Sequence, residues 1–319
     1  MPELPEVETV RQGLEEALLG LKIRNAEKRR RDLRFPIPEN LNEQIQGRTI
    51  TSLRRRAKYL LIDLDNGWTL LSHLGMSGRW TILRDDVITR PGRFAHGGEI
   101  GSGEGPHDWI IINFENGYTA VYSDPRRFGF IDLIGPGSEN EYPMLAKLGP
   151  DPLPSTLTPD ILNRSLIGRK APLKSALLDQ RIVAGLGNIY VCEALSRARL
   201  SPRRRAGTIS SIKGPTERIH RLVGSIHQVM VEAIDAGGST LRDYRGVDGV
   251  ESSGYSADAR AGTGASAGDQ RSDCVSDRHG SRSWMYPDTD AFVSHVRKKT
   301  HQEAFCPGRK SQGRPAAEE

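Results

Sequence analysis

The chain opens with an apolar spacing that is typical of an amphipathic helix. Pro5 suits the first turn of such a helix, where a backbone N–H has no intrahelical partner. The apolar side chains then recur at intervals of three and four residues until Gly20 ends the pattern, at Val7, Val10, Leu14 and Leu18. We therefore predict that the chain begins with one amphipathic helix.

Short strand-like runs follow from residue 21 to about residue 134. They include residues 59–64, 68–73, 109–114, 118–123 and 128–134. Two connections, at residues 65–67 and 115–117, contain the Asn-Gly pair that favours tight hairpin turns with positive φ. Residues 93–106 are rich in Gly and short of apolar side chains, which is typical of an exposed loop. This half is predicted to form an antiparallel sheet or sandwich.

A helical half follows a Pro- and Gly-containing stretch at residues 135–159, where we place the domain boundary. Helical patterns cover residues 160–165, 172–180, 189–198 and 217–236, the last with one apolar stripe. The predicted fold class is α+β with two domains. A helix and an antiparallel β-sandwich occupy residues 1–134, and helices occupy residues 160–244.

The composition changes abruptly after Tyr244. Residues 245–319 contain no Leu and no Ile, and they are rich in Ser, Gly, Ala, Asp and Arg. Such a segment cannot bury enough apolar surface to offset the entropy of ordering it. We expect the tail to be largely disordered.

Charge and cysteine content give only weak information about the partner and the cellular compartment of the protein. The formal charge of +5 suits a polyanionic partner and also many other proteins. The cysteines, Cys192, Cys274 and Cys306, stand far apart and form no Cys-x-x-Cys pair, which favours a reducing compartment. Because no signal peptide and no run of ~18 apolar residues is found, we expect a cytoplasmic protein.

Pro2 is the first candidate catalytic residue, as a nucleophile. Removal of Met1 would leave a secondary amine, and an α-amino group titrates near pH 8, so part of it is unprotonated at neutral pH. Such an amine can attack an aldehyde-like carbon to form a Schiff base. Glu3 is adjacent and Glu6 lies one helical turn on, which places acid/base groups beside it. Proline after an initiator Met is common, however, and has no meaning by itself.

The run Pro-Glu-Leu-Pro-Glu-Val-Glu-Thr-Val at residues 2–10 resembles the opening of the bacterial formamidopyrimidine-DNA glycosylases. Four further motifs follow in the order of that family: RRAKYL at 55–60, HLGMSG at 73–78, DPRRFG at 124–129 and GLGNIY at 185–190. The resemblance spans residues 1 to about 244. It implies a helix-two-turn-helix DNA-binding domain in the helical half.

The resemblance also implies a mechanism. The N-terminal proline attacks C1′ of a damaged nucleoside, expels the oxidised base, and holds the sugar as an imine while β- and δ-elimination cut the strand. Pro2 is then the nucleophile and Glu3 the proton donor in base release. Lys58 serves β-elimination and contacts phosphate. The alternative for Lys58 is a solvated cation on a basic strand.

A base inside a duplex is unreachable, so such an enzyme must flip the nucleotide out and fill the gap. By resemblance Met76, Arg126 and Phe128 fill it, and Arg126 faces the opposite base. Asn188 is expected to cap a helix and to contact the DNA backbone. The other phosphate contacts expected by resemblance are His73, His107, Arg169, Lys170 and Lys174.

The C-terminus departs from the family, which normally ends in a zinc finger with two Cys-x-x-Cys pairs. Cys274 and Cys306 stand singly, so the four zinc ligands are absent, and no residue can be assigned to the finger arginine that serves δ-elimination. One hypothesis is a shifted reading frame near codon 245, which translation of the other two frames would test. The rival hypothesis is a genuine form without a finger. The chemistry itself needs no cofactor.

The leading interpretation is therefore a repair enzyme of the bacterial cytosol that excises oxidised purines, such as 8-oxoguanine and formamidopyrimidines, and nicks the abasic site. Its partner would be damaged double-stranded DNA, and we expect a monomer. One alternative is the related endonuclease VIII type, which favours oxidised pyrimidines. Another is a damaged-DNA-binding protein that is catalytically impaired because it lacks the zinc finger.

Overall fold

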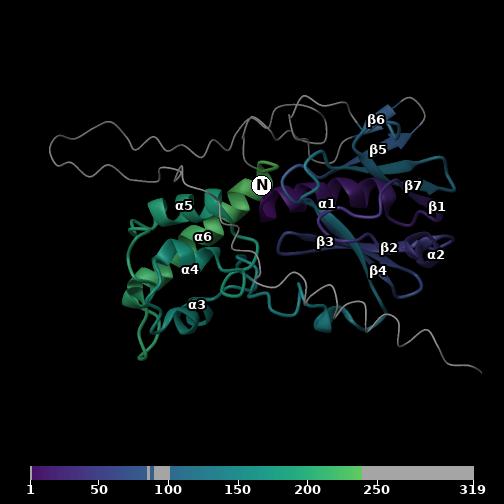
Figure 1. The fold of residues 1–319 in the computed structure, drawn as a ribbon. Helices are drawn as coiled ribbons and strands as arrows, with labels where there is room; N and C mark the ends of the chain where they lie inside the picture. The colour runs from purple at the N-terminus through teal and green to yellow at the C-terminus, as the bar shows by residue number, and fades with distance from the viewer. Residues whose placement is uncertain (1, 85–86, 90–100, 239–319) are drawn as a thin grey trace, which may run out of the picture. The chain divides into compact units, whose positions relative to one another are not determined.

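The computed structural model describes residues 2–84, 87–89 and 101–238 (Figure 1). The predicted disorder of the tail, together with Cys274 and Cys306, lies outside the described residues. Of the predicted loop at 93–106, residues 101–106 are described, and they form bends and turns.

The first helix, α1 (Leu4–Leu18), confirms the opening pattern. Pro5 lies in its first turn, and the Glu3 backbone N–H donates to Glu6 Oε2 at 2.9 Å, which stabilises the start of the helix. The predicted apolar stripe is buried in the core of the strand-rich part: Val7, Val10, Leu14 and Leu18. This packing fixes the direction of the chain as it leaves Pro2.

The strands form two antiparallel sheets. One has the order β1-β7-β8-β5-β6 and the other β2-β3-β4-β9. Their bounds are β1 (Ile23–Lys28), β2 (Ile50–Arg56), β3 (Tyr59–Leu64), β4 (Thr69–His73), β5 (Arg79–Arg84), β6 (Val87–Thr89), β7 (Asp108–Phe114), β8 (Thr119–Ser123) and β9 (Phe130–Ile134). A short helix, α2 (Leu41–Ile45), lies between β1 and β2. Both predicted Asn-Gly turns are present, with Gly67 at φ 80° and Gly117 at φ 88°.

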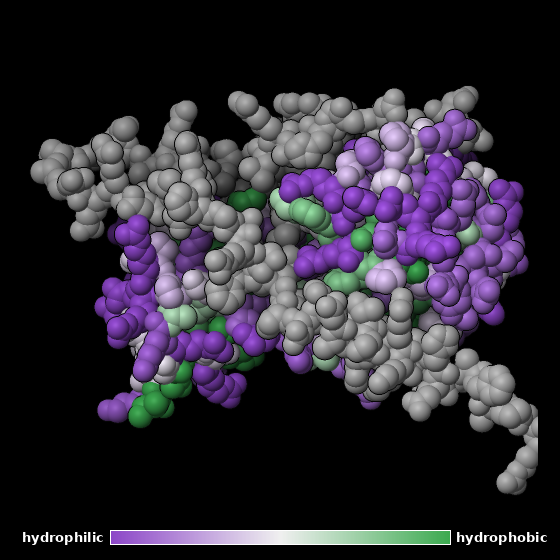
Figure 2. All heavy atoms as spheres, viewed as in Figure 1, coloured by the Kyte–Doolittle hydropathy of each residue, from purple (hydrophilic) through white to green (hydrophobic). Residues whose placement is uncertain are grey.

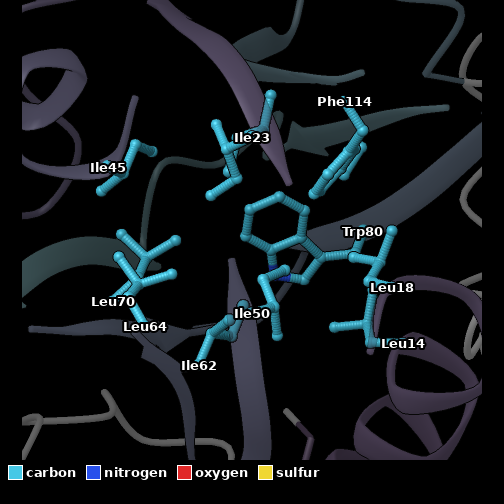
Figure 3. A pocket seen from close by; sticks show the side chains of 12 residues that line it. Leu14, Leu18, Ile23, Ile45, Ile50, Ile62, Leu64, Leu70, Trp80 and Phe114 are labelled. Carbon is cyan, nitrogen blue, oxygen red and sulfur yellow. The ribbon is translucent and has the colours of Figure 1, made fainter. Parts of the chain in front are cut away.

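Apolar side chains from both sheets, α1 and α2 form one core. Trp80 is buried in this core, where its indole ring lies among Ile23, Ile50 and Phe114 (Figure 3), and its Nε1–H donates to Ser72 Oγ at 3.1 Å. A small cavity with a wholly apolar lining remains beside the indole ring. Such a cavity has no polar partner for water and stays dry. The cavity is therefore part of the apolar core of the strand-rich part.

The helical part forms a second core. Its helices are α3 (Pro159–Leu166), α4 (Leu173–Leu178), α5 (Asn188–Arg197) and α6 (Glu217–Asp235), with a short 3-10 turn, η2 (Ala206–Ile209). Another 3-10 turn, η1 (Glu139–Glu141), lies in the segment that connects the strands to these helices. Thr158 and Thr216 cap α3 and α6, since their side chains accept from Ile161 N and Ile219 N. The predicted stripe of α6 packs into this core, and so does Leu4 from α1. No helix among the described residues is long and apolar enough to cross a membrane.

Candidate active site and DNA-binding surface

The start of the chain is fixed against the loop that leads into α5. Pro2 and Glu3 are buried, and the Leu4 N–H donates to the Gly185 carbonyl at 3.1 Å. The Glu3 carboxylate accepts two backbone hydrogen bonds, from Gly187 N at 2.7 Å and from Ile189 N at 2.9 Å. Two distant sequence motifs, PELPE and GLGNIY, therefore meet at the Glu3 carboxylate, since Glu3 and Gly187 are 184 residues apart.

Gly187 is required by close approach. A Cβ at this position would lie 2.3 Å from Glu3 Cδ and 2.4 Å from its Oε1. The φ of Gly187 is −132°, which other residues also adopt, so space and not backbone conformation demands glycine. Gly187 is also the N-cap of α5, and Asn188 is the first helical residue. The prediction that Asn188 caps this helix is therefore wrong, because the chain turns into the helix one residue earlier.

Glu6 supports the residues that precede it. It is buried, its Oε2 accepts from the Glu3 N–H, and its Oε1 accepts from the Tyr190 hydroxyl of α5. A Cβ on Gly238 would lie 3.1 Å from Glu6 Cγ, so the end of the helical part also packs against it. Glu6 thus joins α1, α5 and the segment after α6 around the Pro2–Glu3 start.

Lys58 lies in the two-residue turn between β2 and β3, where Arg56 pairs with Tyr59. It is 7% exposed, which contradicts the alternative of a solvated surface cation. Burial lowers the pKa of Lys58, and this effect outweighs the opposing negative charges of Glu3 and Glu6. Lys58 therefore lies within electrostatic range of both glutamates.

The same burial acts in the opposite direction on Glu3. It raises the pKa of the Glu3 carboxyl, and the charge of Glu6 adds to the rise, whereas Lys58 and the two backbone N–H groups oppose it. A raised carboxyl pKa increases the fraction that can donate a proton, and a lowered ammonium pKa increases the fraction that can accept one. Groups whose pKa values are shifted in this way are suited to acid and base roles in one site.

The three predicted gap-filling residues lie on two loops. Met76, between β4 and β5, is half-buried. Arg126 and Phe128, between β8 and β9, are exposed, and Phe128 is 45% exposed. The Arg126 guanidinium stacks over the Phe128 ring at 4.9 Å. An exposed aromatic ring beside a stacked guanidinium fits a surface that inserts between bases.

Asp124 joins these two loops, a role that the sequence did not reveal. Its buried carboxylate accepts from the Gly129 N–H at 2.8 Å and from the Ser77 hydroxyl, while Ser77 Oγ accepts from the Arg126 N–H at 3.1 Å. Gly75 lets the loops touch, because a Cβ there would lie 2.3 Å from Gly129 N. The two loops therefore form one unit. Asp124 and Ser77 stand inside two of the quoted motifs, which was the available signal.

His73, a predicted phosphate ligand, is buried beside the Met76 loop. It is 8% exposed, it stacks on Phe130, and its Nδ1 accepts from the Gly75 N–H at 3.0 Å. Burial, together with the charges of Lys58 and Arg34, lowers the pKa of His73 to about 3. The ring is therefore neutral near pH 7, and its Nδ1 anchors the Met76 loop. A contact between this imidazole and a phosphate stays a prediction.

The remaining predicted phosphate contacts lie mostly on the surface of the protein. His107 is exposed and lies beside Trp109 at a ring separation of 5.9 Å. Arg169, Lys170 and Asn188 are exposed, and Lys174 is half-buried. In the view of Figure 2, hydrophilic residues cover most of the visible described surface. The contact of these five predicted residues with DNA phosphates stays a prediction.

A zinc site of the family's kind does not fit this chain. Among residues 2–84, 87–89 and 101–238, no group of three or more His, Cys, Asp or Glu side chains could hold a metal ion. The full sequence offers no Cys-x-x-Cys pair, and four clustered thiolates are what such a zinc finger requires. The cysteines of this chain therefore do not match the ligand set of that finger.

Two family models match the chain. Residues 1–131 match the formamidopyrimidine-DNA glycosylase N-terminal domain, and residues 148–245 match the formamidopyrimidine-DNA glycosylase H2TH domain. The chain is 51% identical over 250 residues to the formamidopyrimidine-DNA glycosylase of Bradyrhizobium sp. (strain BTAi1 / ATCC BAA-1182), covering 78% of this chain and 84% of that protein. It is 50% identical over 253 residues to the enzyme of the same name from Rhizobium etli, with the same coverage.

Solved structures agree with these matches. The Lactococcus lactis Fpg in complex with abasic-site DNA is similar with a TM-score of 0.65 and 31% identity, covering 77% of this chain and 83% of that one. MutM in complex with DNA that contains carbocyclic 8-oxo-G is similar with a TM-score of 0.64 and 33% identity, covering 76% and 82%. The fold thus defines a helix-two-turn-helix DNA-repair protein. The chain belongs to the formamidopyrimidine-DNA glycosylase family, as the sequence motifs indicated.

Proposed function

We propose that this protein is a base-excision DNA glycosylase that removes oxidised purines and then cleaves the strand as an abasic-site lyase. The observation that carries the proposal is the cluster at the start of the chain. Pro2 is buried next to Glu3, whose carboxylate is held by two backbone N–H groups, and Lys58 lies within electrostatic range of Glu3 and Glu6. The names of the relatives support the substrate class.

The proposed chemistry follows from these groups. The Pro2 nitrogen, freed by loss of Met1, forms a bond to C1′ while the bond from C1′ to the base breaks, and the departing base takes a proton supplied through Glu3. The bond from C1′ to the ring oxygen O4′ then breaks, the proton lost from the Pro2 nitrogen passes to O4′, and the opened sugar is held as a Schiff base (iminium) on Pro2. The Lys58 amine, whose pKa is lowered by burial, accepts a proton from C2′, and the 3′ phosphate leaves. Water then hydrolyses the imine and regenerates Pro2.

The exposed loops would give access to the damaged base. We assign Met76, Arg126 and Phe128 to the gap that a flipped nucleotide leaves, with Arg126 against the opposite base, because a guanidinium can bond to a base edge while it stacks. We assign the backbone phosphates to His107, Arg169, Lys170, Lys174 and Asn188. The bacterial relatives favour a cytosolic site of action, and we propose that the protein acts there as a monomer on damaged double-stranded DNA.

The test is excision from three duplexes that contain 8-oxoguanine, an oxidised pyrimidine or no lesion. We expect release of 8-oxoguanine and strand cleavage by the wild-type protein. We also expect that Pro2→Gly and Glu3→Gln remove excision but leave lesion binding measurable. Faster excision of the oxidised pyrimidine would instead support the endonuclease VIII type. Binding without product would support a damaged-DNA-binding protein that has lost catalysis.

A further inference from the structure

Asp151 lies in the segment that connects the strand-rich part to the helices, yet its side chain reaches the Lys58 turn. It is 8% exposed. Its carboxylate accepts from Arg55 Nη1 at 2.6 Å, from Arg56 Nη1, and from the Ala57 backbone N–H at 3.1 Å. Three consecutive residues that lead directly to Lys58 are thus held by one buried carboxylate.

Arg55 extends this network to α1. Its side chain is 8% exposed, and its Nε donates to Glu8 Oε2 at 2.8 Å while its Nη1 contacts Asp151. Glu8 also accepts from Arg11 Nε at 2.8 Å. Because α1 begins beside Pro2 and Glu3, the network connects the helix that carries the proposed nucleophile to the turn that carries Lys58.

Ala57 is the strained point of this arrangement. It is a non-glycine residue with φ 53°, at the first position of the turn before Lys58. L-residues with a Cβ rarely adopt this conformation unless the surroundings fix it. Here Asp151 holds the Ala57 N–H, and Arg55 Nη1 donates to the Ala57 carbonyl at 3.3 Å. The N–H and the carbonyl of Ala57 are therefore both bonded to the Arg55–Asp151 ion pair.

We propose that Asp151 is a positioning residue, which acts with Arg55 to hold the Ala57–Lys58 turn so that the Lys58 amine stays within electrostatic range of Glu3. The inference rests on the proposed function for the step that Lys58 serves. The competing explanation is that Asp151 only anchors the connecting segment. Arg56 also bonds that segment, because its Nη2 donates to the Gly149 carbonyl at 2.6 Å and to the Leu148 carbonyl at 3.1 Å.

The strain at Ala57 separates the two explanations. Glycine adopts positive φ freely. Ala57→Gly should therefore let the turn keep its shape without the hydrogen bonds to Asp151. If Asp151 positions Lys58, the double variant Asp151→Ala/Ala57→Gly regains strand cleavage. If Asp151 only anchors the connecting segment, glycine at position 57 cannot replace it and cleavage stays slow.

The experiment measures single-turnover cleavage of a duplex that contains a preformed abasic site, with full-length protein. Asp63→Ala is the matched control, because Asp63 also accepts from an arginine, Arg54 Nε at 2.6 Å, but lies away from the turn on β3. We expect Asp151→Ala to slow cleavage roughly 10- to 100-fold with DNA affinity largely retained. Asp63→Ala should keep the wild-type rate, and the double variant should recover most of the loss. Asp151→Asn keeps an acceptor for the Ala57 N–H, so its cleavage rate should lie between those of the wild-type protein and Asp151→Ala.

Two outcomes overturn the proposal: an equal loss in Asp63→Ala, or no recovery in the double variant. A wild-type protein that binds but does not cleave would refute the proposed function instead. In that case the crystal structure of Asp151→Ala still decides the inference. A displaced residue 57–58 turn supports it, and an unchanged turn overturns it.

Discussion

The most informative single substitution is Gly187→Ala, because it tests how the Glu3 carboxylate is held. The new methyl carbon would lie 2.3 Å from Glu3 Cδ, whereas carbon contacts are comfortable at about 3.5 Å. The carboxylate must therefore retreat by roughly 1 Å. That shift breaks or lengthens the hydrogen bonds from Gly187 N and Ile189 N, now 2.7 and 2.9 Å.

The size of the effect follows from this displacement. A misplacement of about 1 Å in a catalytic group can cost about 100-fold in rate, which corresponds to about 2.7 kcal/mol in the barrier. We expect 8-oxoguanine excision to fall by at least that factor. Because the backbone at residue 187 is extended, the loss comes from the displaced carboxylate and not from backbone strain.

The assay is single-turnover excision from an 8-oxoguanine duplex, with binding measured in parallel. Gly224→Ala is the matched control: Gly224 lies within α6, and a methyl group added there would meet no neighbouring atom within 4 Å, so alanine should leave excision unchanged and stabilise the helix by about 1 kcal/mol. A Gly187→Ala protein that excises within a factor of about two of wild type would refute the reasoning, since that factor is worth only about 0.4 kcal/mol.

Three further predictions concern the supporting structure. The pKa of His73 is about 3 when folded against 6.5 when unfolded, so only the unfolded state takes up its proton between these values. Stability should fall with decreasing pH, by about 2 kcal/mol between pH 7 and pH 5, and urea unfolding of His73→Asn should lack this loss. Trp80→Phe should cost about 1–3 kcal/mol in urea unfolding, because it enlarges the cavity of Figure 3 and removes the donor to Ser72; an unchanged midpoint would contradict this. Arg126→Ala should reduce discrimination between bases opposite the lesion by about 1–3 kcal/mol, measured as the ratio of excision rates, and an unchanged ratio would exclude the assigned contact.

Periodic patterns predicted the longer elements well. The stripe of α1, the stripe of α6 and the two Asn-Gly turns are all confirmed, because each depends on local spacing that a single segment carries. The predicted strand at 59–64 has the bounds of β3. By contrast β1 was not singled out, since three of its six residues are exposed and polar residues interrupt its apolar pattern. The five-residue helix α2 is too short for a helical period to be visible.

The site could be predicted only where a motif carried it. Pro2, Glu3 and Lys58 came from their motifs, but nothing local shows that Gly187 must be small to admit Glu3. Asp151 is 96 residues from Arg55, and its bond to the Lys58 turn depends on how the connecting segment folds back. The phosphate contact of His73 was predicted from the family resemblance alone, and nothing local shows that its ring is buried with Nδ1 bonded to the Gly75 N–H.

The central claim is that Pro2 is the nucleophile, and the most direct measurement is to locate the covalent bond. Borohydride would reduce the imine formed with an 8-oxoguanine or abasic duplex, and mass spectrometry of the digested adduct would identify the attached residue. We predict attachment to the α-amine of residue 2 in a chain that has lost Met1. Attachment to Lys58 or another lysine, or base release without any adduct, would contradict it.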